Sequence, residues 1–273
     1  MRKAEIFTLL GAFILMGALS VPAQADVTAY VIHGIDGDDF NMDPTLPVDV
    51  WVSGLGCALT GFEFGTRVGP LNVPAGDYDI SIFLADAASP CAGAEVIDLD
   101  GVTLPDGANA TIIAHRTADG TTGTGDLLGL GITASLFGND FSATDRGKAR
   151  VVAQHAAFAP SVDVVVSRDY SDPDSPGVTV PGFSNPTSSG SAVMSQINAQ
   201  FRPGDWDLAL EIDGAAVFGP TKVRLKPFTV TYVYAVGDFA GGTFQYLVFT
   251  DGGQKGSEPS RKRANRGRRA ENL

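Results

Sequence analysis

The sequence predicts an all-β protein that consists of two tandem antiparallel β-sandwiches of the immunoglobulin-like type. Apolar and polar residues alternate in many short runs, which is the period of a half-buried strand. The chain contains 33 Gly and 16 Pro among its 273 residues, as expected for short strands joined by tight turns. No long segment keeps a 3.6-residue apolar period, so helical crossovers and a parallel sheet are not expected.

The alternating runs are rich in Val, Ile, Tyr, Phe and Thr, and Gly, Pro or Asp residues bound them, which favours strands. An apolar fraction of 44% is sufficient to fill the cores of two such domains. The expected strands are Ala29 to His33, Val48 to Val52, Tyr78 to Leu84, Ala110 to His115, Arg150 to Ala153, Val162 to Val166, Trp206 to Ile212, Phe228 to Val236 and Thr243 to Phe249.

A weak internal repeat divides the chain. Near the start of each half, a strand that ends in His is followed by a loop, a Pro and the tripeptide Val-Asp-Val. These residues are His33 with Val48-Asp49-Val50, and His155 with Val162-Asp163-Val164. Each half continues with a turn and an aromatic strand, at residues 74–79 and 203–207 respectively.

A polar, turn-rich connector near residues 141–148 separates the two copies of the repeat. We therefore expect a first β-sandwich over residues 26–143 and a second over residues 144–252.

The stretch from Gly147 to Val166, GKARVVAQHAAFAPSVDVVV, resembles the signature of the domain of unknown function 4397 family. The Pro-Ala-Gly-Asp-Tyr turn at residues 74–78 looks like the same family. The resemblance covers nearly the whole mature chain as two copies, and the first copy departs from it by an insertion of about eight residues between His33 and Val48. It implies an exported bacterial protein with β-sandwich repeats, and it implies no activity, since the family has none established.

The N-terminus has the three-part layout of a secretory signal peptide. Arg2 and Lys3 precede an apolar run from Ile6 to Leu19, and residues 21–25 form a small-x-small cleavage pattern. The run is too short to span a membrane, and no later segment reaches spanning length. We therefore expect a signal peptide over residues 1–25 and an exported protein located in the periplasm, on the cell surface or in the medium.

The net charge of −12 is unevenly distributed. Residues 26–252 contain ten basic and 28 acidic side chains, whereas residues 253–273 contain seven basic and two acidic ones. The acidic body excludes nucleic acid and anionic lipid as partners of the folded part. The tail is expected to be disordered. It would either lie on an anionic envelope surface, fold back onto the acidic body, or act only as a solubilising segment.

Cys57 and Cys91 are the two cysteines of the chain. An exported protein meets an oxidising compartment, in which such a pair normally closes. A metal or redox site is not favoured, because the cysteines lack a C-x-x-C spacing and neighbouring ligands. We therefore expect a disulfide.

The inserted loop carries the strongest cluster of candidate ligands. Oxygen ligands at alternating positions suit Ca²⁺, although the remainder of an EF-hand pattern is absent. The alternative is a solvated acidic loop, and the turn from Asp169 to Asp174 has the same two interpretations. The candidate calcium ligands are Asp36, Asp38, Asp39, Asn41 and Asp43.

The three histidines, His33, His115 and His155, lie in or at the ends of expected strands. The repeat gives His33 and His155 matched positions, which favours a structural role such as a ring bonded to a neighbouring Asp or to the backbone. Asp49 and Asp163 alternate with core Val residues, so they are expected to point outward or to cap a turn.

No nucleophile elbow, P-loop, dinucleotide fingerprint or zinc-protease motif is present in the sequence. The leading hypothesis is a non-catalytic envelope or secreted protein, an interaction or structural module for an unknown envelope protein or glycan. The alternatives are a hydrolase that acts on an extracellular polymer through a carboxylate pair, and a calcium-stabilised structural protein. No cofactor other than calcium is expected.

Overall fold

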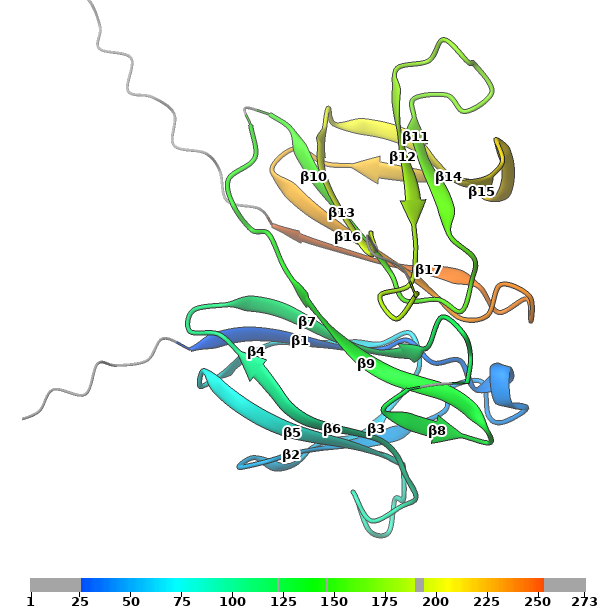
Figure 1. Cartoon of the computed structure of the whole chain (residues 1–273). Helices are drawn as coiled ribbons and strands as arrows, with labels where there is room; N and C mark the ends of the chain where they lie inside the picture. Colours follow the sequence, from blue (N-terminus) through cyan, green and yellow to red (C-terminus); the bar gives the residue numbers. More distant parts are fainter. Residues whose placement is uncertain (1–25, 122, 146, 190–193, 253–273) are drawn as a thin grey trace, which may run out of the picture.

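The computed structural model describes residues 26–252 except 122, 146 and 190–193, and this part of the chain is all-β, as the sequence predicts (Figure 1). The expected signal peptide and basic tail, residues 1–25 and 253–273, lie outside the described residues. No helix within the described part is long and apolar enough to cross a membrane.

The first half of the chain forms one nine-stranded sheet in the order β3-β2-β5-β6-β8-β9-β7-β1-β4. A short 3₁₀ helix, η1 (Gly37–Phe40), lies between β1 and β2. The strands are β1 (Val27–His33), β2 (Val48–Val52), β3 (Gly56–Phe62), β4 (Arg67–Val73), β5 (Gly76–Leu84), β6 (Glu95–Leu104), β7 (Asn109–Arg116), β8 (Gly125–Leu127) and β9 (Leu130–Gly138).

The second half forms two four-stranded sheets, in the orders β13-β10-β16-β17 and β12-β11-β14-β15. The strands are β10 (Ala149–His155), β11 (Val162–Ser167), β12 (Gly177–Phe183), β13 (Gln196–Phe201), β14 (Gly204–Ile212), β15 (Ala215–Leu225), β16 (Thr229–Val236) and β17 (Gln245–Gly252).

The two halves share a strand order. The order β4-β1-β7-β9 of the first half corresponds to β13-β10-β16-β17 of the second, and β3-β2-β5-β6 corresponds to β12-β11-β14-β15. In the first half the short strand β8 pairs with both β6 and β9, so the two groups are hydrogen-bonded into a single sheet. The repeat seen in the sequence is therefore also a repeat of topology.

The expectation of purely antiparallel sheets is wrong at one position in each half. β1 pairs in parallel with β7, and β10 pairs in parallel with β16. A parallel pair needs a long connection between its strands, and this connection is commonly a helix. Here the intervening strands supply it, so no helical crossover is required.

The apolar side chains form cores inside each half and a third cluster between the halves. Val48, Val50, Ile80 and Ile82 belong to the first core, and the second core contains Val162, Val164, Leu208, Leu210 and Val233. The cluster between the halves contains Ile32, Ile113 and Phe137 from the first half and Val152, Val230, Tyr232, Tyr234, Val236 and Leu247 from the second.

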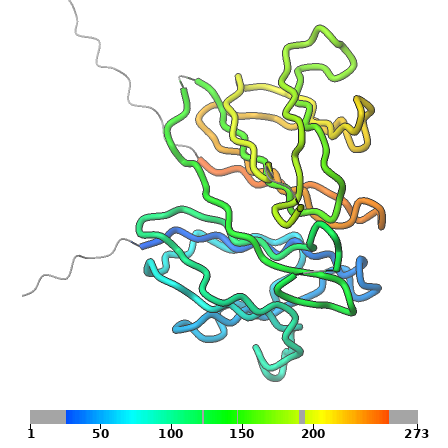
Figure 2. Tube along the Cα trace, in the orientation of Figure 1, coloured from blue at the N-terminus to red at the C-terminus, as the bar shows by residue number. Residues whose placement is uncertain are grey.

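This middle cluster joins the face of β1, β7 and β9 to the face of β10, β16 and β17. The Cα trace shows the two halves side by side, with the connector after β9 passing from one to the other (Figure 2). Arg67 on β4 reinforces the contact by an ion pair of 2.6 Å with Asp251 on β17.

The expected disulfide is confirmed. Cys57 at the start of β3 is bonded to Cys91 in the loop between β5 and β6, with the two Cα atoms 5.9 Å apart. The bond fastens an edge strand to a loop that connects two other strands of the same sheet.

Removal of this disulfide is expected to destabilise the protein. The closed loop spans a sequence separation of 34 residues, for which the chain-entropy model gives a stabilisation of about 3 to 4 kcal/mol. Urea unfolding with and without reductant measures this difference. The double variant Cys57→Ser, Cys91→Ser is the control and should be insensitive to reductant, and an equal response of both proteins would contradict the prediction.

Candidate functional site

The predicted calcium ligands of residues 36–43 do not converge. Asp36 caps η1, where its Oδ1 accepts a hydrogen bond of 3.0 Å from the Asp38 backbone N–H. Asp43 Oδ1 accepts hydrogen bonds from the Thr45 backbone N–H and hydroxyl at 2.9 and 2.8 Å. Asn41 takes a left-handed conformation at the end of η1, with a φ of 54°.

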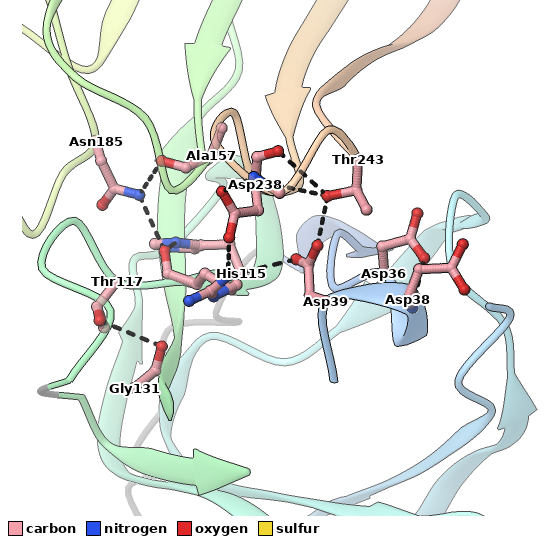
Figure 3. A network of polar contacts seen from close by, with 12 residues as sticks. Asp36, Asp38, Asp39, His115, Thr117, Gly131, Ala157, Asn185, Asp238 and Thr243 are labelled. Carbon is pink, nitrogen blue, oxygen red and sulfur yellow. Dashed lines mark hydrogen bonds and ion pairs between the residues drawn. The ribbon is translucent and has the colours of Figure 1, made fainter. Parts of the chain in front are cut away.

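Figure 3 shows the Asp36 and Asp38 side chains apart from the contacts that Asp39 makes. The described part of the chain contains no group of three or more His, Cys, Asp and Glu residues arranged to hold a metal ion. Calcium binding by this loop stays a prediction that this geometry does not favour.

Asp39 takes part in a buried network between the two halves. Its side chain is 0% exposed and lies 3.9 Å from the Arg116 guanidinium, which forms an ion pair of 2.7 Å with Asp238. The Thr243 hydroxyl donates a hydrogen bond to Asp39 Oδ1 (Figure 3). Burial raises the pKa of Asp39, while the Thr243 hydrogen bond and the Arg116 charge act in the opposite direction.

Arg116, at the end of β7, is the centre of this network. Its guanidinium lies 4.3 Å from the centroid of the Phe158 ring, a cation–π contact. Its backbone carbonyl accepts a hydrogen bond of 3.0 Å from Asn185, whose amide group also donates to the Ala157 carbonyl at 2.8 Å. The network therefore locks the two halves together, and the acidic residue that sequence analysis treated as a ligand is a structural partner of Arg116.

Arg116→Met is expected to destabilise the protein strongly. The substitution keeps much of the side-chain volume but leaves Asp39 as a buried carboxylate without a counter-charge, which typically costs about 3 to 5 kcal/mol. Urea unfolding measures the effect. Arg224→Met is the matched control, because Arg224 and its partner Asp205 are 73% and 59% exposed and such pairs contribute little. Equal destabilisation by the two variants would contradict this role of Arg116.

His33 and His155, which have matched positions in the repeat, make the same contact through Nδ1. His33 Nδ1 accepts a hydrogen bond of 3.2 Å from the Ile35 backbone N–H, and His155 Nδ1 accepts one of 3.4 Å from Ala157. His33 Nε2 then donates to the Leu46 carbonyl at 2.8 Å, two residues before the Val-Asp-Val strand. Each ring thus ties the end of one strand to the turn that follows it.

His115 lies on β7 and is also fully buried. Its Nδ1 lies 2.7 Å from the Arg116 carbonyl oxygen, and its Nε2 lies 2.8 Å from the Ser135 hydroxyl. The pKa of each of the three histidines is lowered to about 4, by burial in all three and, for His155, also by the nearby His115. The rings are therefore neutral at physiological pH.

Asp49 and Asp163 make matching contacts in the two halves. Each accepts a hydrogen bond from a backbone N–H group at a turn of the neighbouring strand, as expected of a turn cap. Asp49 lies between the core residues Val48 and Val50 on β2 and is only 1% exposed, because the loop that carries Asp86 and Cys91 covers it. Its Oδ1 accepts a hydrogen bond of 2.8 Å from the Gly61 backbone N–H, and Asp163 Oδ1 accepts one of 3.1 Å from Gly182. Both glycines have positive φ, 58° and 72°, at the bulges of the edge strands β3 and β12.

The second carboxylate oxygen of Asp49, Oδ2, makes further hydrogen bonds. Oδ2 accepts hydrogen bonds from the backbone N–H groups of Asp86 and Cys91, at 3.4 and 2.9 Å. The carboxylate therefore orders the loop that carries the disulfide. These hydrogen bonds lower the pKa of Asp49 although burial opposes them as the largest single effect.

The three histidines should make stability depend on pH. Because their pKa values fall from 6.5 to about 4 on folding, the unfolded chain binds protons between these pH values that the folded protein does not. The contribution of the neutral histidines to the free energy of unfolding is fully present above pH 6.5. It is lost as the pH falls towards 4, and the total loss is on the order of several kcal/mol.

Urea unfolding between pH 7.5 and 4 measures this dependence. The variant His33→Gln should show a shallower decrease, since one of the three titrating rings is removed. A free energy of unfolding that is unchanged between pH 7 and 5 would contradict the prediction.

A polar recess of about 440 Å³ lies in the second half, between the β11–β12 loop and the outer face of the β12-β11-β14 sheet. Ser167, Thr179 and Glu211 line it from these strands, and Asp169, Tyr170 and Asp172 line it from the loop. Figure 1 shows this loop projecting from the end of the second half that faces away from the first.

Hydrogen bonds fold the loop back over the sheet. The Tyr170 hydroxyl donates to Glu211 at 2.6 Å, and the Tyr170 backbone N–H donates to Asp207 at 3.0 Å. The Glu211 carboxylate raises the pKa of Tyr170, so the phenol stays protonated. Ser171 donates to Asp169 from its backbone and its hydroxyl, which lowers the pKa of that carboxyl.

The floor of the recess contains a hydroxyl without a hydrogen-bond partner among the described residues. It belongs to Ser167, which is 7% exposed and whose Oγ is buried. Gly177 pairs with Ser167 across the sheet, and a Cβ at Gly177 would lie 3.0 Å from the Ser167 Cβ. Glycine at this position therefore keeps the space next to Ser167 open.

One wall of this recess could be predicted from the sequence, and the remainder could not. The acidic turn from Asp169 to Asp174 was a second ligand candidate, whereas Ser167 and Glu211 were not identified. Glu211 lies 42 residues beyond Asp169 in the chain and is brought close to the loop only by the pairing of β11 with β14.

Comparison with known families gives one match. Residues 40–165 match the model of a family described as "Domain of unknown function (DUF4397)". The match begins at the end of η1 and ends within β11, so it contains the Val-Asp-Val strands of both halves. The family resemblance expected from the sequence is thereby confirmed. No curated protein matches the chain.

Similar solved structures include a "putative cell adhesion protein" from Bacteroides ovatus, at 9% identity and a TM-score of 0.26, over 86% of this chain and 100% of that one. A leucine-rich repeat protein from Bacteroides thetaiotaomicron has 12% identity and a TM-score of 0.22, over 77% of this chain and 25% of its own. The Bacillus anthracis TIE protein has 8% identity and a TM-score of 0.21, over 78% and 32%. These TM-scores are low, so the likenesses assign no function.

Proposed function

We propose that this chain, which belongs to the DUF4397 family through residues 40–165, is a non-catalytic exported recognition module that binds a glycan in the recess of its second half. Each half is an immunoglobulin-like β-sandwich in this proposal, and the protein acts in the periplasm, on the cell surface or in the medium. The repeated strand order and the signal-peptide pattern of residues 1–25 support these two points.

The observation that carries the proposal is the unsatisfied Ser167 hydroxyl on the floor of a recess with carboxylates on its walls. A buried polar group without a partner is costly, and a ligand hydroxyl in the recess would satisfy it. Asp169, Asp172 and Glu211 supply acceptors for further hydroxyl groups. Tyr170, Pro173 and Val178 supply apolar surface for the C–H groups of a sugar ring.

The charge of the recess narrows the class of glycan. Three carboxylates line it, and the body of the protein carries 28 acidic against ten basic residues. Uronic acids and other anionic sugars would be repelled, while neutral and amino sugars would not. The position of the recess also suits recognition, because the loop lies at an end of the protein and a rigid sheet supports it.

Glu211→Gln should weaken glycan binding without loss of the fold. The substitution removes one acceptor charge and alters the hydrogen bond that positions Tyr170, so we expect at least a tenfold increase in Kd, as for the loss of a hydrogen bond to a charged group. The measurement is binding to arrays of neutral, amino and uronic-acid oligosaccharides, followed by calorimetry on the best binder.

Glu95→Gln is the matched control, because Glu95 is an exposed Glu on β6 in the other half. It should bind like the unmodified protein. The proposal is wrong if no oligosaccharide of the three classes binds, if the uronic acids bind best, or if the two variants weaken binding equally.

A further inference from the structure

The first half contains an apolar cavity of about 90 Å³ between its two layers. Val31 and Ile112 line it from β1 and β7, and Val50, Leu59 and Ile82 line it from β2, β3 and β5. Protein interiors are close-packed, and an apolar void of this kind removes contacts from the side chains around it. The second half, which repeats the same strand order, shows which side chains can fill the equivalent space.

In the second half, two aromatic rings occupy the corresponding end of the sandwich. Phe201 and Trp206 pack edge to face, with their ring centroids 4.9 Å apart, and both are more than nine-tenths buried. The strand registers place Val73 at the position of Phe201 and Tyr78 at the position of Trp206. Both Val73 and Tyr78 line the cavity, so the smaller side chain at position 73 leaves the space open.

The hydrogen bonds of the two aromatic residues support this correspondence. Trp206 Nε1 donates to the Arg202 carbonyl at 2.8 Å, four residues earlier in the chain. The Tyr78 hydroxyl donates to the Pro74 carbonyl at 2.7 Å, also four residues earlier. The two rings are therefore anchored in the same way, and the difference between the halves lies in what surrounds them.

The end of the sandwich is covered in the second half and open in the first. The Arg168 guanidinium lies 4.1 Å from the centroid of the Trp206 ring and donates hydrogen bonds to the carbonyls of Arg202, Pro203 and Asp205. In the first half, the tight turn after β2 places Leu55 at the cavity, and this side chain is 51% exposed. An exposed leucine at the mouth of an apolar cavity is a surface that an apolar ligand would cover.

The charge of the first half restricts the head group of such a ligand. Residues 26–138 contain 16 acidic side chains and two basic ones, Arg67 and Arg116. Both arginines form ion pairs with residues of the second half, Asp251 and Asp238, and neither lines the cavity. An anionic head group would find only repulsion here.

We propose that the first half binds the end of an alkyl chain with an uncharged or cationic head group, inserted between the sheets beside Leu55 and Tyr78. Apolar cavities of comparable size stay dry and take up small apolar molecules. The enclosed volume holds the end of the chain, and the exposed apolar surface of Leu55 covers the portion nearer the head group. This site is independent of the recess in the second half.

The test compares three probes that share an eight-carbon chain: 1-octanol, octyltrimethylammonium and octanoate. Calorimetry at several temperatures should show binding of the first two with a negative heat-capacity change, and at least tenfold weaker binding of octanoate. Shifts of the methyl NMR signals of Val50 and Ile82 should accompany binding, because these side chains line the cavity.

Two variants and one control test whether the alkyl chain binds in this cavity. The double substitution Val73→Phe, Tyr78→Trp introduces the aromatic pair of the second half and should abolish binding. Leu55→Arg places a charge at the mouth and should weaken binding at least tenfold, whereas Leu128→Arg, at a leucine that is 71% exposed and does not line the cavity, should not.

Because Leu55 is exposed, its variant should fold, and thermal unfolding verifies this for each protein. The proposal is overturned if 1-octanol does not bind, if octanoate binds as tightly as 1-octanol, or if Leu55→Arg and Leu128→Arg have equal effects. Glu211→Gln should leave octanol binding unchanged, so failure of one proposed site is distinguishable from failure of the other.

Discussion

The buried ion pair between Arg116 and Asp238 is the interaction on which the arrangement of the two halves depends. Arg116 leaves the end of β7, Asp238 follows β16, and Asp39 approaches the same guanidinium from the loop after β1. A charge in this position is tolerated only if its partners are present, because burial without compensation is expensive. The apolar layer of Ile32, Ile113 and their neighbours brings the halves together, and the ion pair selects the orientation in which the charges are satisfied.

The two halves use one framework for different purposes. In both, a buried His ties a strand end to the next turn, and an Asp of the Val-Asp-Val strand caps a glycine bulge on the neighbouring edge strand. The turn after this strand is tight in the first half and long in the second. The long turn forms a polar recess over the sheet, and its first residue, Arg168, closes the sandwich end that Leu55 leaves open in the first half. Variation in this connection, together with the smaller side chain at position 73, thus distinguishes the two candidate sites.

Features of this fold that have a local signal in the sequence are predictable from it. Alternation along the inner strands predicted β2, β5, β11 and β14, and the His and Val-Asp-Val spacing revealed the repeat. Among the strands of the described residues, the alternating runs did not predict β3, β4, β6, β8, β9, β12, β13 and β15. In β3 and β12, glycine bulges interrupt the alternation. The candidate sites were harder to predict. The loop of residues 36–43 has the composition of a calcium loop, yet its Asp39 is committed to Arg116 and Thr243, which lie 77 and 204 positions away.

The all-β character, the internal repeat and the disulfide partners follow from the residue order alone, because side-chain period, motif order and a count of two cysteines need no knowledge of the fold. The folded chain was needed to show which strands pair in parallel, which acidic residues are buried and which end of a sandwich is filled. These outcomes depend on side chains from distant strands that meet at one place. The free energies of desolvation and of close packing depend on these contacts between distant strands, and not on the residues adjacent in the sequence.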